Sequence, residues 1–205
     1  MVQRVQAKAN AKAQLKGKWG TAIGALLLGE LVVAVAAALV LIPLIGAIAF
    51  SGIAAAITLG FAKFSLKFAN GEKPTVGVIF SGFESFLKAW GLTIVTAIFT
   101  LLWSLLLYVP GIIKAISYSM AMYVLAENPE VGVMEALKRS KEMTKGHKGQ
   151  LFVTYLSFIG WSIVCSFTLG IGYLWLIPYM QVTMANIYNQ LKGESVQVGE
   201  AGVAL

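Results

Sequence analysis

The amino-acid sequence predicts an all-α membrane protein in which six transmembrane helices form three hairpins, each preceded by a cytoplasmic amphipathic helix. Three observations lead to this fold class. The 205 residues have a mean hydropathy of +0.79, and only 12% of them are charged, whereas about a quarter of the residues of a soluble domain are charged. Six apolar segments approach the length of a bilayer. Lysine and arginine also gather in alternate connections between these segments.

The six predicted spans follow from the length that a helix needs to cross a membrane. About 20 apolar residues cover a hydrocarbon core of about 30 Å. The fourth segment is short, and the last carries several amides near its end. All six belong to one membrane domain, residues 1–193, which a short cytoplasmic tail, 194–205, follows. The spans cover residues 20–42, 45–68, 90–109, 111–126, 150–169 and 172–190.

The distribution of positive charge predicts the orientation of these spans. Fifteen of the sixteen Lys and Arg residues fall at the N-terminus, at the C-terminus, or around the second-to-third and fourth-to-fifth connections. Only Lys114 falls on the other side. Cytoplasmic connections carry an excess of Lys and Arg, so both termini are expected in the cytoplasm. An odd number of spans would break this alternation, and the charge pattern therefore supports six.

The first two amphipathic helices differ in the kind of face that they present. Helix 4–18 spaces its basic residues four apart, which places them on one face. Helix 76–87 instead has an apolar face with three phenylalanines, which is typical of a helix that lies in the membrane interface. The predicted contacts with anionic lipid on the first helix are Arg4, Lys8, Lys12 and Lys16.

The third amphipathic helix, 129–145, is expected to begin with Asn128 as N-cap and Pro129 at the first helical position. Glu135 and Arg139 are spaced for an ion pair, and Gly146 suits the residue after the helix. We expect this helix to lie on the membrane. Its predicted contacts with anionic lipid headgroups are Lys138, Arg139 and Lys145.

A short repeat links two of these helices. Pro-x-Val-Gly-Val occurs at 74–78 and again at 129–133, and in both places a short helix and then a span are expected. Repeats of this kind are common in transporters and also in membrane scaffolds. The chain is therefore expected to consist of three similar units.

The segment 101–161, which contains "YVPGIIKAISYSMAMYVLAENPEVGVMEALKRSKEMTKGHKG", closely resembles the DUF975 family of bacterial integral membrane proteins. The resemblance continues through 169–191 and includes the opening segment 13–23. It implies a six-span, multi-pass protein of the bacterial cytoplasmic membrane. The family's domain has no known function, so the resemblance implies no activity, substrate or catalytic residue.

Two ionisable residues within the spans are the candidate functional residues. Glu30 lies near the middle of the first span, where a charge is costly and marks a functional site by default. The alternatives are an ion or proton relay, a contact with a polar substrate, a protonated carboxyl bonded between helices, or a carboxyl in a water-accessible pocket. Lys114, in the fourth span, either extends to the headgroups or pairs with Glu30 inside the protein.

Composition excludes most enzyme classes. The chain has one His, one Cys and no Asp. This argues against a His-rich zinc site, an aspartyl phosphate and a Ser-His-Asp triad. We therefore expect no catalytic activity, no metal and no cofactor, and the positive charge is attributed to membrane lipids rather than nucleic acid.

Two functions remain open from the sequence. The first is transport, permeation or lipid translocation without an ATPase of its own, because the chain has no ATP-binding motif. The second is a non-catalytic scaffold or accessory subunit that binds anionic lipids or partner membrane proteins. The expected partners are membrane lipids with anionic headgroups, together with a second copy or a partner membrane protein, since Gly20 and Gly24 permit close helix packing.

Overall fold

A computed structural model describes residues 3–41, 45–106 and 108–203, and all regular structure within these ranges is helical. The predicted outer connection at 42–44 lies outside the described residues. The elements are Arg4–Leu15 (α1), Trp19–Ala37 (α2), Ala38–Leu41 (η1), Ile45–Ala69 (α3), Val76–Ser85 (η2), Phe86–Leu106 (α4), Tyr108–Tyr118 (α5), Ala121–Glu127 (α6), Val133–Met143 (α7), Lys148–Ser166 (α8) and Tyr173–Val203 (α9).

Five helical stretches of the described residues are long and apolar enough to cross a membrane. They correspond in order to the first five predicted spans. α9 covers the sixth, 172–190, but amide side chains such as Gln181 and Asn186 lower its hydropathy, and it is not among the five. The number of six spans and their orientation therefore stay predictions. The five stretches are Trp19–Leu41, Gly46–Ala69, Val76–Leu105, Val109–Glu127 and Lys148–Ser166.

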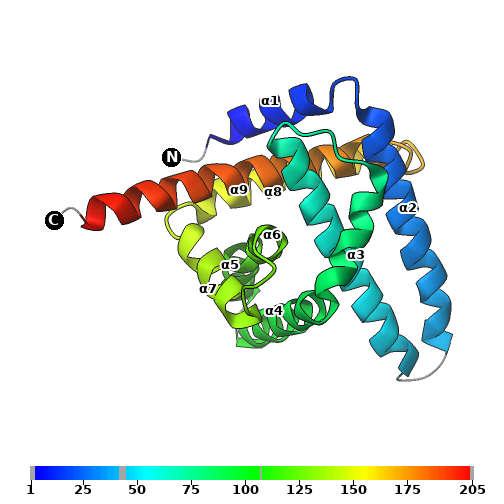
Figure 1. Ribbon diagram of the computed structural model, residues 1–205, viewed down its shortest axis with the longest axis horizontal. Helices are drawn as coiled ribbons and strands as arrows, with labels where there is room; N and C mark the ends of the chain where they lie inside the picture. The colour runs from blue at the N-terminus through cyan, green and yellow to red at the C-terminus, as the bar shows by residue number, and fades with distance from the viewer. Residues whose placement is uncertain (1–2, 42–44, 107, 204–205) are drawn as a thin grey trace.

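The helices do not form one parallel bundle (Figure 1). α2 and α3 lie side by side, and α9 runs across them. α1 lies along α9, against which it packs Ala7, Ala11 and Leu15. α3 is the central element, because it contacts η2, α9, α4, α6 and α2. Its inward side chains therefore join the two largest hydrophobic clusters of the described residues.

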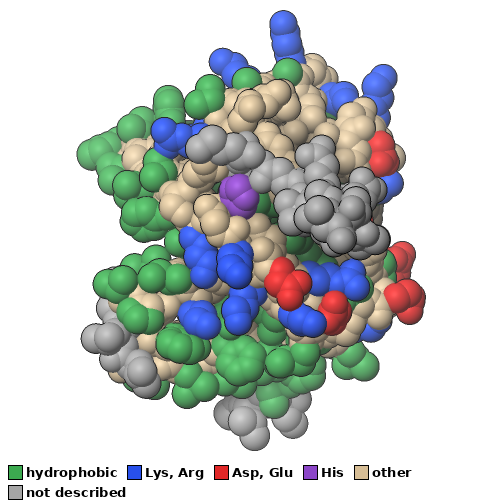
Figure 2. Space-filling model, turned by 90° about the vertical axis from the view of Figure 1, so that its left-hand side faces the viewer, with side chains coloured by type: hydrophobic (Ala, Val, Ile, Leu, Met, Phe, Trp, Pro, Cys, Tyr) green, Lys and Arg blue, Asp and Glu red, His purple; other side chains and the backbone are tan. Residues whose placement is uncertain are grey.

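The surface carries large apolar side chains that a soluble protein would bury. They gather on α2, α4 and α8, where Leu31, Leu105 and Ile159 are all more than half exposed. Figure 2 shows a band of Lys and Arg side chains on one face, with apolar side chains below it and to its left. An exposed apolar surface of this extent is typical of contact with lipid or another protein.

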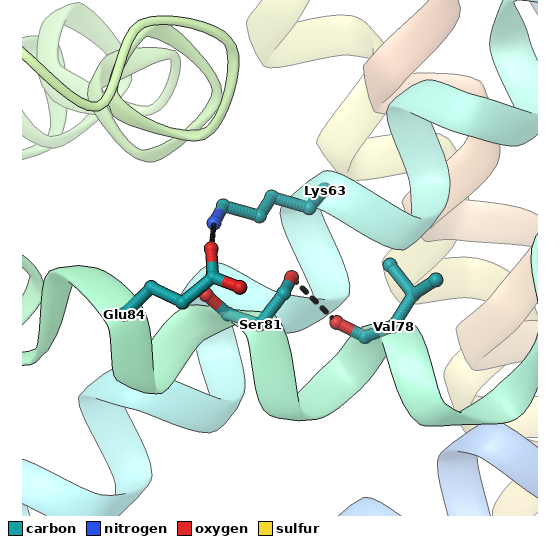
Figure 3. Close-up of polar contacts among 4 residues, drawn as sticks. All are labelled: Lys63, Val78, Ser81 and Glu84. Atoms are coloured by element: carbon teal, nitrogen blue, oxygen red, sulfur yellow. Dashed lines mark hydrogen bonds and ion pairs between the residues drawn. The ribbon is translucent and has the colours of Figure 1, made fainter.

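η2 packs against α3 so closely that the two backbones touch. A Cβ atom on Gly60 would lie 1.8 Å from the carbonyl oxygen of Ile79, and one on Gly82 would lie 1.9 Å from that of Ala56. Lys63 of α3 adds two hydrogen bonds, one to the Ser81 carbonyl at 2.8 Å and one to Glu84 at 3.2 Å, the second of which is drawn in Figure 3. This contact explains why 76–85 does not form the expected separate amphipathic helix, and instead forms a 3-10 helix that continues directly into α4.

The predicted fourth span, 111–126, is two helices rather than one. α5 ends at Tyr118 and α6 begins at Ala121. The break leaves the Ser117 carbonyl and the Met120 N–H without helical partners, and the fully buried hydroxyl of Ser140 on α7 bonds both. Met120 donates to Ser140 Oγ at 3.2 Å, and Ser140 donates to the Ser117 carbonyl at 2.8 Å. A break within a candidate span is tolerated because these backbone groups keep hydrogen-bond partners.

The expected start of the helix at 129–145 is wrong. Asn128 does not cap its N-terminus but ends α6, where its N–H bonds the Val124 carbonyl at 3.0 Å. α7 begins four residues after Pro129, at Val133, since Gly132 is the extended residue before it. The far end agrees better with the prediction, because Gly146 adopts a left-handed backbone with φ 86° in the turn that follows α7.

The contact between η2 and α3 predicts that alanine is destabilising at one glycine of η2 and has little effect at another. Gly82→Ala should lower the free energy of unfolding by about 1–3 kcal/mol or more, because its methyl group overlaps the Ala56 carbonyl. Gly77→Ala should have little effect, since no atom lies within 4 Å of the new Cβ. Thermal or denaturant unfolding in detergent measures both. Equal stability of the two variants would contradict the backbone contact.

The break between α5 and α6 makes a separate prediction about Ser140. Ser140→Ala should lower the free energy of unfolding by about 1–3 kcal/mol. It removes the partner of the buried Met120 N–H and leaves the Ser117 carbonyl only the longer bond from Thr144, at 3.4 Å. Ser162→Ala is the matched control, since its hydroxyl bonds only the Phe158 carbonyl within the same helix. The same unfolding measurement applies, and a control as destabilised as Ser140→Ala would disprove the assigned role.

Candidate functional site

Glu30 lies at the centre of its span and at the surface of the protein. It is the twelfth of the 23 residues from Trp19 to Leu41, which places it about 16 Å from either end at 1.5 Å per residue. Its side chain is exposed and lines a groove of about 230 Å³. The groove's other polar residues are Thr58 of α3 and Gln181 of α9. Three elements therefore bring polar side chains to one point.

The local packing explains why these three elements meet. Gly29, which precedes Glu30, lies so close to Phe61 that a Cβ atom would be 2.6 Å from its ring. α2 thus packs tightly against Phe61 of α3 beside Glu30, and Glu30 lies at the edge of that contact. α9 crosses here with Pro178, whose missing N–H interrupts the helical hydrogen bonds, one turn before Gln181.

The hydrogen bonds of the groove leave it with both acceptors and donors. Tyr123, a buried residue of α6, donates to Gln181 Oε1 at 3.2 Å. This bond uses the oxygen of the amide, so its N–H groups remain as donors. Thr58 donates to the Ala54 carbonyl at 2.8 Å and keeps its lone pairs as acceptors. With the Glu30 carboxyl, the groove offers hydrogen bonds of both kinds in an otherwise apolar region.

A second groove continues from the first around α3. The two share Ala54 and Thr58, and the second has a volume of about 620 Å³ between α3, α4 and the α5–α6 break. Its α4 wall carries Thr93, Thr96 and Thr100, and the Thr100 hydroxyl is buried and has no hydrogen-bond partner among the described residues. Sequence reasoning missed these threonines, although their spacing of three and four residues marks one face of a helix.

Lys114 does not pair with Glu30. Its ammonium group lies over the indole ring of Trp103, 4.3 Å from the ring centroid. Within the described ranges no ion pair joins Lys114 to Glu30. The structure therefore contradicts the idea of an internal pair between them. Trp103 and Lys114 come from α4 and α5, and their cation–π contact joins these two helices.

Six of the seven basic residues predicted to contact anionic lipid are exposed, and Lys8 is the exception. The half-buried Lys8 bonds the Ser157 hydroxyl of α8 and lies 4.5 Å from the centroid of the Phe158 ring. Burial and the nearby charge of Arg4 lower the pKa of Lys8. Its role in this structure is to hold α1 against α8. The exposed six are Arg4, Lys12, Lys16, Lys138, Arg139 and Lys145.

Other candidates have simpler explanations. Cys165 is a buried residue without a disulfide and packs with Phe158 and Leu176. The expected pair of Glu135 and Arg139 is present at 2.9 Å, and this hydrogen bond lowers the pKa of Glu135. Among the residues that the structure describes, no cluster of three or more His, Cys, Asp or Glu could hold a metal ion.

A pair of double-mutant cycles tests the position of Lys114. Lys114→Met and Trp103→Leu should show a coupling of about 0.5–2 kcal/mol in the free energy of unfolding, the range measured for cation–π pairs. Lys114→Met and Glu30→Gln should be additive within about 0.3–0.5 kcal/mol, because these residues do not touch. Strong coupling in the second cycle would restore the internal ion pair.

Comparisons with known proteins bear on identity rather than on activity. Comparison with curated proteins found no match, and comparison with solved structures found none either. One family model matches the chain in two overlapping segments, residues 1–117 and 105–195, and is described as "Protein of unknown function (DUF975)". Because these matches cover nearly the whole chain and agree with the resemblance noted in the sequence, the protein belongs to the DUF975 family.

Proposed function

We propose that this protein lets polar lipid headgroups cross the membrane along the Glu30 groove, without an ATPase of its own. The observation that carries the proposal is the position of Glu30, exposed at the centre of an apolar span beside Thr58 and Gln181. Moving a headgroup through hydrocarbon is slow because it loses its hydrogen bonds to water. A groove that supplies acceptors and donors at mid-depth lowers that barrier.

The shape of the site favours lipid over a dissolved solute. Glu30 and Thr58 are both exposed at the protein surface rather than enclosed among helices. A lipid can place its headgroup in such a groove while its acyl chains stay in the bilayer. The volume of about 230 Å³ corresponds to about eight waters at ~30 Å³ each. This is room for one headgroup or a short file of water.

The neighbouring hydroxyl-lined groove supports the same function. It shares Thr58 with the Glu30 groove and adds Ser51, Thr96 and Thr100. Hydroxyl groups spaced along a helix offer successive hydrogen bonds to a moving headgroup. The two grooves together would give a headgroup several polar contacts around α3 instead of one isolated site.

A scaffold that gathers anionic lipids is the second candidate. It is favoured by the exposed basic side chains of α1 and α7, such as Lys12 and Lys138. Each Lys or Arg close to an anionic membrane contributes about 1 kcal/mol to binding. This function needs no groove at Glu30, and the two candidates therefore differ in what Glu30 does.

Reconstitution into vesicles that contain a trace of fluorescent phospholipid tests the first candidate. A membrane-impermeant quencher measures exchange between leaflets. The wild-type protein should accelerate exchange over empty vesicles. Glu30→Gln should slow it by about tenfold, which corresponds to ~1.4 kcal/mol of barrier.

Glu72→Gln is the matched control, because Glu72 is also exposed but pairs with Lys67 at 3.0 Å outside the groove. It should leave the exchange rate unchanged. If wild-type vesicles exchange lipid no faster than empty ones, the translocation proposal fails. Retained binding to acidic vesicles would then favour the scaffold.

A further inference from the structure

A pocket that is separate from both grooves lies where α6, α7 and α9 meet. Its volume is about 480 Å³, within the range of pockets that bind small molecules. Glu127 ends the candidate span Val109–Glu127, and Lys148, one residue after the pocket residue His147, begins the next. The pocket therefore lies at the level where two spans end.

The pocket walls carry basic side chains from three separate parts of the chain. Arg139 comes from α7, Lys145 and His147 from the α7–α8 connection, and Lys192 from α9. Figure 2 looks onto this side of the molecule, where Lys and Arg side chains gather beside a few carboxylates. Convergence of basic groups from distant segments onto one hollow is typical of a site for an anion.

The carboxylates of the pocket do not cancel these cations. Glu127 already accepts two hydrogen bonds, from Tyr188 at 2.8 Å and from Lys192 at 2.7 Å. The remaining carboxylate, Glu142, faces Arg139 and Lys145 as well as His147. Among the lining residues the permanent cations Arg139, Lys145 and Lys192 outnumber the carboxylates Glu127 and Glu142. Lys192 pairs with Glu127, and Arg139 pairs through Nε with Glu135, which does not line the pocket. Lys145 and the terminal nitrogens of Arg139 are therefore the donors that an anion would meet.

Arg139 and Lys145 have N–H groups that remain available as hydrogen-bond donors. Arg139 uses Nε for its bond to Glu135, so its terminal nitrogens keep their N–H groups. Lys145 forms no ion pair within the described ranges, and its side chain is exposed. Guanidinium and ammonium groups bind phosphate oxygens more strongly than neutral donors do.

The rest of the lining is apolar. Val124, Met143 and Leu191 form the part of the wall that the charged groups do not cover. Val124 and Leu191 are already buried, and Met143 is partly exposed. A glycerol backbone and the start of an acyl chain would cover the exposed part of Met143, whereas a free inorganic anion would not. We propose that this pocket binds a phosphate-bearing group, of the kind found on an acidic phospholipid headgroup.

The proposal is tested with full-length protein in detergent, by the rise in unfolding temperature that a bound ligand causes. The probes are dioctanoyl phosphatidylglycerol, inorganic phosphate, and dioctanoylglycerol, which has the same chains and no phosphate. The phosphatidylglycerol should stabilise the wild type in a saturable manner, and dioctanoylglycerol should not.

Lys145→Gln should weaken binding of the phosphatidylglycerol by about tenfold, the effect of losing one charge-assisted hydrogen bond. Lys141→Gln is the matched control, because Lys141 is an exposed cation of α7 that does not line the pocket. It should change the affinity by less than about twofold. Since both side chains are exposed, neither substitution endangers folding.

The outcomes separate the possible ligands. Saturable binding of inorganic phosphate with the same dependence on Lys145 would assign the pocket to free phosphate, whereas binding of the lipid alone would assign it to headgroups. Equal losses in Lys145→Gln and Lys141→Gln, or equal stabilisation by dioctanoylglycerol, would overturn the proposal. Because the pocket shares no residue with the Glu30 groove, loss of lipid exchange and loss of this binding are independent results.

Discussion

The direct backbone contact between η2 and α3 is the constraint on which the rest of the structure depends. Gly60 and Gly82 make it possible, because any larger residue at either position would overlap a carbonyl group. The contact fixes where α4 starts, and so where its threonines lie relative to α3. α3 then has its remaining faces free for α2, α6 and α9. Both grooves are consequences of this arrangement, since each has α3 as one wall.

Interrupted helices create the polar sites of this molecule. The break between α5 and α6 requires a hydroxyl from α7, and Ser140 supplies it. α7 is thereby held against α6, and Arg139 of α7 lines the pocket where α6, α7 and α9 meet. Pro178 interrupts α9 where this helix passes Glu30. At the α5–α6 break the freed backbone groups bond the Ser140 hydroxyl, which accounts for the polar side chain beside it.

The sequence predicts the helical class and the first five apolar segments well, because hydropathy and length depend on local composition alone. It predicts Glu30 as a candidate for the same reason. It does not predict the partners of Glu30, since Thr58 and Gln181 lie 28 and 151 residues further along the chain and only tertiary packing brings them together. The predicted N-cap at Asn128 is wrong for a different reason. Asn followed by Pro is typical of a helix start, but α6 extends to Glu127 and Asn128 is its C-cap.

The central claim is that the Glu30 groove is a polar path across the membrane. Measuring whether water reaches the groove at the centre of the membrane tests this claim most directly. With Cys165 replaced by Ala, Thr58→Cys is treated in intact vesicles with a water-soluble maleimide. Val35→Cys serves as the control, because Val35 is 68% exposed on the apolar surface of α2. We predict that the cysteine at position 58 reacts and the one at position 35 does not. Equal, negligible reaction at both positions would contradict the account.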